Sequence, residues 1–274
     1  MIKDWYVRYV EEMPVWLVFG VYPFITQLMA YWFFNAPFIL YQFAKHKQLE
    51  KSAGRFLSSY VKFMDRYLIN PEHAPLSKDF YNKIIIHVTC LHFLVALPLS
   101  VLFCQLATPV HPRGYDEIWS GIKLLPVHLI IFITCDEIMF FVTHYYLHKI
   151  PFLYKTIHSF HHQLRYTVSV GCEYAHPLEF IMGNIVPVIL GPILCQSHLL
   201  IYLSWITLKM FETIYVHSGF DFGLTRLEFL TKEHAYHHSH YQDNYGTWYG
   251  VCDATFKTNQ HFLEYQKKKV LKGE

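Results

Sequence analysis

The sequence predicts an all-α, polytopic membrane protein with about four transmembrane helices or helical hairpins and a cytosolic, helical, histidine-rich domain. Three observations support this fold class. Of the 274 residues, 53% are hydrophobic and only 16% are charged, which is more apolar than soluble proteins usually are. Four long runs contain no Asp, Glu, Lys or Arg. The 19 histidines include dense clusters that follow the third and fourth runs.

The first two uncharged runs, 15–44 and 84–110, are each longer than the roughly 20 residues that cross a bilayer. The first predicts either one tilted span or a tight hairpin. Pro23, Asn35 and Pro37 favour a break in it, because proline removes a backbone donor and kinks a helix. The second run predicts one further span.

The third uncharged run covers 124–135 and continues as a helix if Asp136 and Glu137 face inward. Carboxylates at this depth are costly, so we expect both to form hydrogen bonds to histidines or to loops. The fourth run, 180–208, is interrupted by Pro187, Gly191 and Pro192. This pattern predicts a membrane hairpin over about 180–215 that returns to its starting side.

Loop charge predicts the orientation, because lysine and arginine are retained on the cytoplasmic side. The loop 45–83 is rich in both and is therefore predicted to be cytosolic. The third run then returns to the cytosol, and the hairpin brings the C-terminal part back to the same face. The sequence thus divides into membrane spans with a cytosolic loop, 1–143, and a histidine-box region that includes the hairpin, 144–274.

Composition excludes two other classes of protein. A net charge of +2 without a basic patch gives no support to nucleic-acid binding. The six cysteines are scattered and show no CxxC spacing, so they predict neither a disulfide framework nor a cysteine-based zinc site.

Three histidine motifs carry the chemistry. HYYLH places two imidazoles at i and i+4 on one helical face. HSFHH and HAYHH each place three at i, i+3 and i+4, so that one helix offers two nitrogens to one ion and a third to its neighbour. The eight residues are His144, His148, His158, His161, His162, His234, His237 and His238.

Neutral imidazole is the commonest metal ligand, and eight imidazoles suit two metals better than one. All-nitrogen ligation with vacancies for dioxygen favours redox-active iron over structural zinc, which usually recruits cysteine. A single HxxxH pair is more often a packed core pair or a haem ligand pair. Haem ligation needs isolated histidines that face each other in mid-span, whereas these stand in consecutive pairs at the ends of apolar runs.

The order HxxxH, HxxHH, HxxHH behind membrane spans resembles the fatty acid hydroxylase and sterol desaturase superfamily, whose members are endoplasmic-reticulum enzymes with a histidine-bound di-iron centre. The resemblance covers about 136–258. Within it, EYAHPLE at 173–179 and ETIYVHSGFD at 212–221 look most like the 4-methylsterol monooxygenase branch. A tryptophan and a glycine that this branch commonly carries near its end are replaced here by Cys252 and Lys257.

The resemblance implies that the eight motif histidines bind iron. It also draws attention to His217, which stands four residues before Asp221, where the family has a further histidine pair. Asp221 is a candidate ligand or a partner that orients an imidazole. His176 in EYAHPLE is a candidate ligand, with the alternative that it caps a turn before Pro177.

The resemblance implies a function as well: oxidation of a sterol 4-methyl group with two iron ions and dioxygen as co-substrate. Electrons come from a partner because no GxGxxG or flavin pattern is present, and the family implies cytochrome b5 and an NAD(P)H-dependent reductase. The histidine boxes then face the cytosol at the endoplasmic reticulum. Within the enzyme class, the alternative is hydroxylation or desaturation of another sterol position or of a fatty acyl lipid. Outside it, the alternative is a metal transporter or a membrane zinc hydrolase.

Overall fold

A computed structural model describes residues 1–46, 54–70, 76–107, 113–224 and 226–272. In these ranges the chain is built from helices without a strand, and one antiparallel bridge joins Leu68 to Phe220. Five of the described helical segments are long and apolar enough to cross a membrane. The predicted all-α, multi-pass class is therefore confirmed. The candidate spans are Trp16–Lys45, Lys78–Cys104, Tyr115–Lys149, Pro177–Leu194 and Leu199–Val216.

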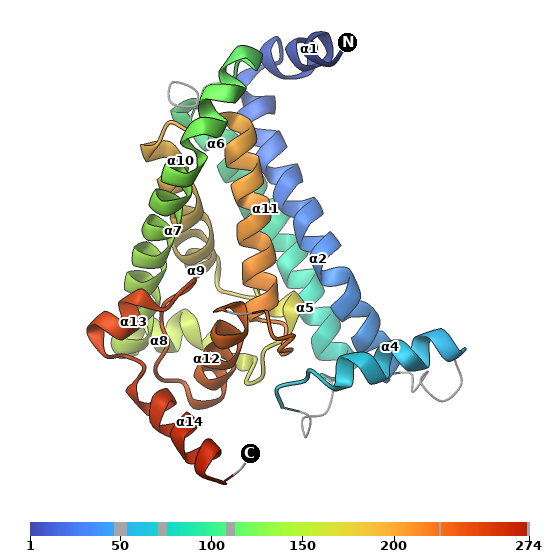
Figure 1. Ribbon diagram of the computed structural model, residues 1–274, viewed down its shortest axis with the longest axis vertical. Coiled ribbons are helices and arrows are strands. Elements are labelled where there is room, and N and C mark those ends of the chain that lie inside the picture. Colours follow the sequence, from blue (N-terminus) through green and yellow to red (C-terminus); the bar gives the residue numbers. More distant parts are fainter. Residues whose placement is uncertain (47–53, 71–75, 108–112, 225, 273–274) are drawn as a thin grey trace.

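The helices follow the chain in a simple order (Figure 1). The spanning part contains η2 (Trp16–Val21) with α2 (Tyr22–His46), α5 (Lys78–Leu91) with η3 (His92–Ala96) and α6 (Leu97–Ala107), α7 (Ile118–Lys149), α9 (Pro177–Glu179) with η7 (Phe180–Ile185) and α10 (Val186–Leu194), and α11 (Leu199–Val216). The remaining labelled helices are α1 (Ile2–Tyr6), α4 (Arg55–Asp65), α8 (Pro151–Thr156), α12 (Arg226–His240), α13 (Val251–Phe256) and α14 (Gln260–Lys272).

The first uncharged run forms a single span, which decides between the two alternatives that its prolines left open. The π-helical segment η2 passes directly into α2, and Pro37 is accommodated inside that helix. Asn35 is fully buried, and its amide donates a hydrogen bond to the carbonyl oxygen of Tyr31 one turn earlier (3.0 Å). The amide nitrogen of this polar side chain thus finds an acceptor within its own helix, and the helix continues past it.

The fourth uncharged run forms two antiparallel helices, α10 and α11, with a reversal between Leu194 and Leu199. His198 stands at this reversal, where its Nδ1 accepts a hydrogen bond from the Leu200 amide (3.2 Å) and so caps α11. Gly191 lets α10 approach α7 closely, because a Cβ at this position would lie 2.6 Å from the Phe132 Cα. The hairpin is therefore packed against the long helix that carries the first histidine motif.

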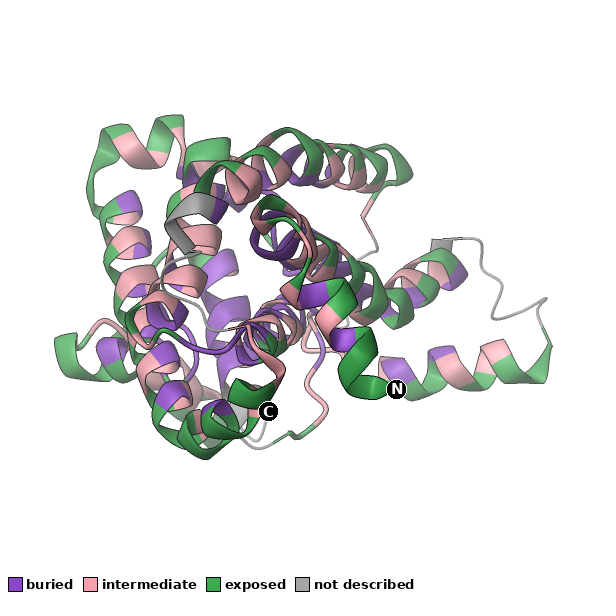
Figure 2. Cartoon of the chain, turned by 90° about the horizontal axis from the view of Figure 1, so that it is seen from above, coloured by how far each residue is buried: buried purple, intermediate pink, exposed green. Residues whose placement is uncertain are grey.

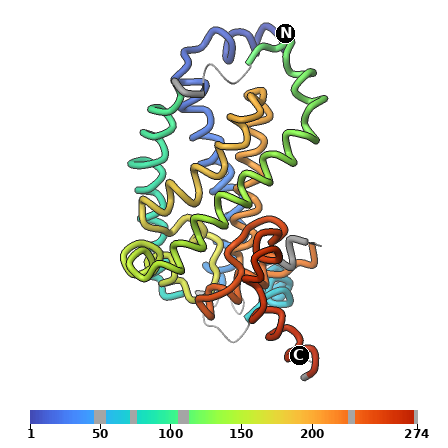
Figure 3. Tube along the Cα trace, turned by 90° about the vertical axis from the view of Figure 1, so that its left-hand side faces the viewer, coloured from blue at the N-terminus to red at the C-terminus, as the bar shows by residue number. Residues whose placement is uncertain are grey.

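The helices α8, α12, α13 and α14 gather at one end of the bundle, and the N-terminus lies at the other end (Figures 1 and 3). The end of the bundle that carries α12, α13 and α14 is also reached by the C-terminal ends of α2, α7 and α11. The predicted loop 45–83 belongs to this end as well, through α4. Its segments 47–53 and 71–75 lie outside the described residues.

Seen along the bundle, buried residues occupy the interior and exposed ones the outer faces (Figure 2). The outer faces of the spans are apolar: Phe33 is 73% exposed, Leu102 67% and Ile130 67%. Large apolar side chains so exposed on long helices fit contact with lipid. The interior beneath the histidine-rich end is filled by a core that includes Tyr31 and Tyr174.

Candidate metal centre

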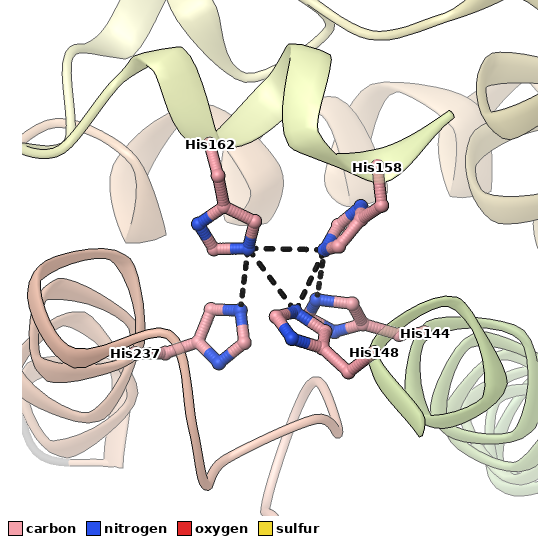
Figure 4. A group of neighbouring side chains, drawn as sticks. All are labelled: His144, His148, His158, His162 and His237. Atoms are coloured by element: carbon pink, nitrogen blue, oxygen red, sulfur yellow. Dashed lines mark hydrogen bonds between the residues drawn. The ribbon is translucent and has the colours of Figure 1, made fainter. Parts of the chain in front are cut away.

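Five imidazoles from three segments converge on one point (Figure 4). His144 and His148 come from the last turns of α7, His158 and His162 from the 3₁₀ turn His158–Gln163, and His237 from α12. One ring nitrogen of each lies within 4.8 Å of those of the others. The Nε2 atom of His158 lies 2.8 Å from that of His148 and 3.1 Å from that of His144. This first group can hold one metal ion.

Four further imidazoles form a second group within the same limit of 4.8 Å, and all four are buried. They are His161, His217, His234 and His238. The Nε2 atom of His234 lies 2.8 Å from that of His217 and 3.0 Å from that of His238. His217 is the residue that ends α11, so the membrane hairpin contributes a donor to this second group.

Each HxxHH motif serves both groups. In the first motif, His158 and His162 point into the first group, while His161 points into the second. In HAYHH the assignment is reversed: two histidines point into the second group, and His237 points into the first. The spacing i, i+3, i+4 thus divides three imidazoles between two neighbouring positions, which is the arrangement that the sequence predicted.

Backbone carbonyl oxygens fix the tautomers of most of these rings. Each can only accept a hydrogen bond, so the Nδ1 atom that faces one must carry the proton and its Nε2 must carry a lone pair. The Nδ1 atoms of His144 and His237 donate to the carbonyl oxygens of Tyr245 (3.0 Å) and Asp243 (2.6 Å). The corresponding acceptors for His161, His217 and His238 are the carbonyl oxygens of Tyr174, Thr213 and Leu164.

The consequence is that four of these Nε2 lone pairs, on His144, His217, His237 and His238, each face the Nε2 atom of a neighbouring ring about 3 Å away. The lone pairs therefore converge inside each group. A cation placed there would be coordinated by them, and the hydrogen bonds at Nδ1 orient the rings as they do for histidine ligands in metal sites. The donor set therefore fits metal binding on the geometry of the rings themselves, and its all-nitrogen chemistry suits iron.

Burial keeps the imidazoles neutral. Removal from water lowers the pKa of His161 to about 4, and lowers that of His217 to about 3 with help from the neighbouring His161. The same cause places the pKa values of the following residues well below the ordinary value: His158, His162, His234, His237 and His238. Neutral imidazole is the form that binds a metal, so the protein presents the donors in the competent state near pH 7.

One carboxylate completes the contacts of the first group. The Oε1 atom of Glu179 lies 2.7 Å from the Nδ1 atom of His158, and both side chains are buried. A carboxylate on the outer nitrogen of a histidine ligand orients the ring and raises its basicity. Glu179 lies at the start of the membrane hairpin, so the hairpin reaches the first group at this end as it reaches the second through His217.

The loop between α12 and α13 supplies two of the carbonyl acceptors and is itself held by two acids. Asp253 accepts hydrogen bonds from the backbone amides of Tyr245 (2.9 Å) and Gly246 (2.6 Å). Glu137 accepts from the amides of Thr247 (2.9 Å) and Cys252 (3.0 Å). This loop role is one of the two alternatives expected for Glu137 from the sequence.

A buried ion cluster lies beside this loop. The Nζ atom of Lys209 lies 2.6 Å from Asp136 Oδ2 and 3.0 Å from Glu212 Oε2, and it donates to the Thr247 hydroxyl (2.9 Å). The Trp248 indole also donates to Asp136 (2.7 Å). Asp136 therefore forms its hydrogen bonds with this cluster and the loop rather than with a histidine.

A cavity opens directly onto the two groups. Its lining includes His144, His158, His161, His217 and His234. Lys209 and Glu212 line the same cavity on the side of α11. We refer to it as the metal-side cavity.

The structure thus brings together nine of the eleven predicted site residues and places two elsewhere. His176 is the N-cap of α9, where its Nδ1 accepts from the Leu178 amide (3.2 Å). Asp221 forms an ion pair with Lys232 (2.6 Å), and its amide donates to the Tyr67 carbonyl oxygen. These contacts hold both residues away from the two groups, so the ligand role considered for them is replaced by a cap and an ion pair.

The carbonyl acceptors escaped prediction because every residue has one. Two positions did carry a signal: Asp243 and Asn244 adopt φ of +64° and +54°, and these residue types tolerate that region better than most. His240 also lies outside both groups. It stacks on Tyr236 with a ring separation of 4.0 Å.

Comparisons with known proteins agree with this site. Residues 129–258 match the family model described as fatty acid hydroxylase, and this range contains all nine converging histidines. Methylsterol monooxygenase 1 of Rattus norvegicus is 29% identical over 222 residues, 78% of this chain and 73% of its own. No solved structure matches the chain.

Two further relatives differ in the lipid that their names state. The C-4 methylsterol oxidase erg25 of Schizosaccharomyces pombe is 27% identical over 223 residues, 77% of this chain and 72% of its own. Fatty acid hydroxylase ahd1 of Mycosarcoma maydis is 31% identical over 221 residues, 78% of this chain but 54% of its own. These similarities confirm the resemblance to the fatty acid hydroxylase and sterol desaturase superfamily and identify the chain as a multi-pass membrane oxidoreductase of the monooxygenase class.

Proposed function

We propose that this chain oxidises the 4-methyl group of a sterol, with two iron ions held by its nine converging histidines. The observation that carries the proposal is that two adjacent imidazole groups line a cavity between the helices. The names of the relatives support a sterol as the substrate, since several are methylsterol monooxygenases over most of their length.

The first group, His144, His148, His158, His162 and His237, would hold one ion, and the second group, His161, His217, His234 and His238, would hold the other. When bound, such a pair supplies the activation of dioxygen that oxidation of an unactivated C–H bond requires. Asp221 and His176 are not part of this proposed ligand set.

The chain's own residues perform the other tasks. The carbonyl oxygens of Tyr245, Asp243 and Leu164 hold protons on Nδ1 and so aim Nε2 inward. Burial of the rings excludes bulk water, which would compete with the substrate and would quench reactive species. Glu179 holds the His158 ring in place through its Nδ1 contact.

The placement of the donors argues against the two alternatives from other classes. A metal transporter needs ligands along a path across the membrane. These nine come from the last turns of α7, the turn His158–Gln163, the C-terminal end of α11 and α12, and these ends of α7 and α11 lie with α12 at one end of the bundle (Figure 1). A zinc hydrolase needs a carboxylate base beside a vacant position on a single zinc. Of the carboxylates that line the metal-side cavity, Glu179 is engaged with a ring nitrogen and Glu212 with Lys209.

Electrons must come from outside the chain, and we propose cytochrome b5 with an NAD(P)H-dependent reductase as donors. We also propose that the chain resides in the endoplasmic reticulum with the histidines on the cytosolic face. The high lysine and arginine content of the loop 45–83 at the same end supports this orientation.

The test combines a metal count with turnover. Purified full-length protein is expected to contain close to two irons per chain and to convert a 4-methylsterol to its hydroxymethyl product in the presence of dioxygen and the electron donors. A His238→Gln variant is the matched negative control, because it removes one donor of the second group. A single zinc without iron-dependent turnover would overturn the proposal. Conversion of a fatty acyl lipid but not of the sterol would overturn the substrate assignment and retain the metal centre.

A further inference from the structure

A second cavity lies between the membrane helices and meets the metal-side cavity. It is bounded by parts of α2, α6, α10 and α11, and we refer to it as the membrane cavity. It encloses about 1000 Å³ of space that atoms do not fill, part of which is open to the outside. Three residues line both cavities: Asn184, Lys209 and Thr213. These three lie at the boundary between the two cavities, which we refer to as the passage.

The walls of the membrane cavity change from apolar to polar toward the histidines. On α11, Ile206 precedes Thr213, and the helix then ends at the second histidine group. On the first arm of the hairpin, η7 and α10, the polar Asn184 is five residues after Glu179 in the chain, and the apolar Ile189 is ten residues after it. On α2, which runs toward the same end, Gln27 comes after the aromatic residues. An elongated apolar molecule with one polar end therefore fits in one direction, with its polar end at the passage.

Most polar groups at the passage are already engaged. Lys209 is bound by two carboxylates and a hydroxyl, as described above. The Thr213 hydroxyl donates to Glu212 (3.2 Å), and the Gln27 amide donates to Glu173 (2.9 Å). The side chain of Asn184, in contrast, has no hydrogen-bond partner within the described ranges of the chain, although it is partly buried.

The backbone at Asn184 affects where its side chain points. Asn184 belongs to η7, a π-helical segment that separates α9 from α10 and is one of four such segments in the described ranges. The extra residue in such a turn shifts the side chains that follow. The sequence thus places an amide without a protein partner on a turn that aims it between the two cavities.

The charge at the passage selects the kind of polar group that Asn184 can bind. The buried carboxylates that line the same cavities as Asn184 include Glu173 and Glu212, against one lysine, which is itself also paired with Asp136. Glu173 is further bound by His92 at 2.6 Å. This excess of negative charge disfavours the binding of an anionic headgroup. The Asn184 amide offers both a hydrogen-bond donor and an acceptor, so it can bind a hydroxyl group, which is also both.

We propose that Asn184 binds the hydroxyl group of a lipid alcohol whose apolar body occupies the membrane cavity. With the hydroxyl at the passage, carbon atoms within a few bonds of it enter the metal-side cavity, so this contact determines which carbon is oxidised. The inference rests on the proposed function and deepens it, because in a 4-methylsterol the methyl group is attached next to the carbon that carries the hydroxyl.

The test is equilibrium binding to metal-loaded full-length protein. The probes are 4-methylcholestan-3-ol, 4-methylcholestane without the hydroxyl, and stearate as a fatty acid. The unmodified protein is expected to bind the alcohol about tenfold more tightly than the hydrocarbon, the effect of one hydrogen bond in a buried site. Asn184→Leu is expected to weaken alcohol binding by about the same factor and to leave hydrocarbon binding unchanged. Asn184→Ser, which keeps a hydroxyl, is expected to restore part of the difference.

The matched control is Asn82→Leu, which makes the same exchange at an exposed position of α5 that lines neither cavity. Equal binding of alcohol and hydrocarbon by the unmodified protein would overturn the inference without the need for any variant. Retention of the difference in Asn184→Leu, or tighter binding of stearate, would also overturn it. Selective alcohol binding without oxidation of the sterol would support the inference and overturn the proposed function. Oxidation of the sterol without selective alcohol binding would support the proposed function and overturn the inference.

Discussion

Replacement of Glu179 by glutamine should weaken metal binding in the first group and leave the second group intact. The change keeps the size of the side chain and an acceptor oxygen for the His158 Nδ1–H, but it removes the negative charge. The two partners are buried and 2.7 Å apart, which is the short distance typical of a charge-assisted hydrogen bond. Glu179 bonds to His158 of the first group, whereas the outer nitrogens of three of the four rings in the second group face backbone carbonyls.

The magnitude follows from the kind of hydrogen bond. Bonds to a charged group contribute about 1.5–3 kcal/mol and neutral ones about 0.5–1.5 kcal/mol, so the exchange should cost about 1–1.5 kcal/mol. This corresponds to a roughly tenfold weaker affinity, the lower end of the range of about 10- to 100-fold seen when partners of metal-binding histidines are changed.

The assay is metal content per chain after dialysis against a graded series of chelator concentrations. The variant should lose one ion per chain at a chelator activity about tenfold lower than the unmodified protein does, while the other ion is retained. Glu264→Gln, an exposed exchange on α14, is the matched control and should behave as the unmodified protein. Equal retention of both ions in Glu179→Gln would refute the idea that the carboxylate tunes His158, and equal loss of both would refute separate groups.

Three further outcomes are expected. Gly191→Ala should destabilise the protein by about 1–3 kcal/mol because its Cβ collides with Phe132, whereas Gly183→Ala meets nothing within 4 Å; thermal unfolding of both in one detergent checks this, and equal midpoints would contradict it. Lys209→Met should cost about 3–5 kcal/mol, since it leaves two buried carboxylates unpaired, while the exposed Lys123→Met should be near neutral in the same measurement. Removal of metal by a chelator should lower the unfolding temperature, because an ion bound by the converging imidazoles of the folded state stabilises that state; an unchanged temperature would contradict metal binding by the folded site.

The helical pattern of the histidines was predictable from the sequence because it depends only on local geometry. The i, i+3, i+4 spacing of HAYHH on α12 divides its rings between the two groups in the expected way. HSFHH divides its rings likewise, although its backbone forms a 3₁₀ turn and not the expected α-helical turn. The all-α class followed equally from local information, namely the long uncharged runs. Whether 15–44 formed a span or a hairpin did not follow, because proline and asparagine favour a break locally, yet the helix accommodates Asn35 and Pro37 in its interior.

The positions of His176 and Asp221 could not be predicted from the local sequence. Both belong to motifs that look like ligand motifs, yet tertiary contacts engage them elsewhere. Asp221 is held by Lys232 and by the segment around Tyr67, which is far away in the sequence. The loop carbonyls that fix the tautomers are equally invisible in the sequence, because a carbonyl oxygen is common to every residue and only the fold of residues 241–258 decides where each points.

The length of α7 has a consequence for the depth at which chemistry takes place. Its 32 residues extend over about 48 Å, whereas the hydrocarbon core of a bilayer is about 30 Å thick. An apolar helix so much longer than the membrane must tilt or project, and His144 and His148 lie in its last turns. The site would then stand level with the lipid headgroups. At that level the apolar body of a lipid stays in the hydrocarbon core, and the atoms near its polar end lie beside the histidines. A product made more polar by oxidation is then already next to water.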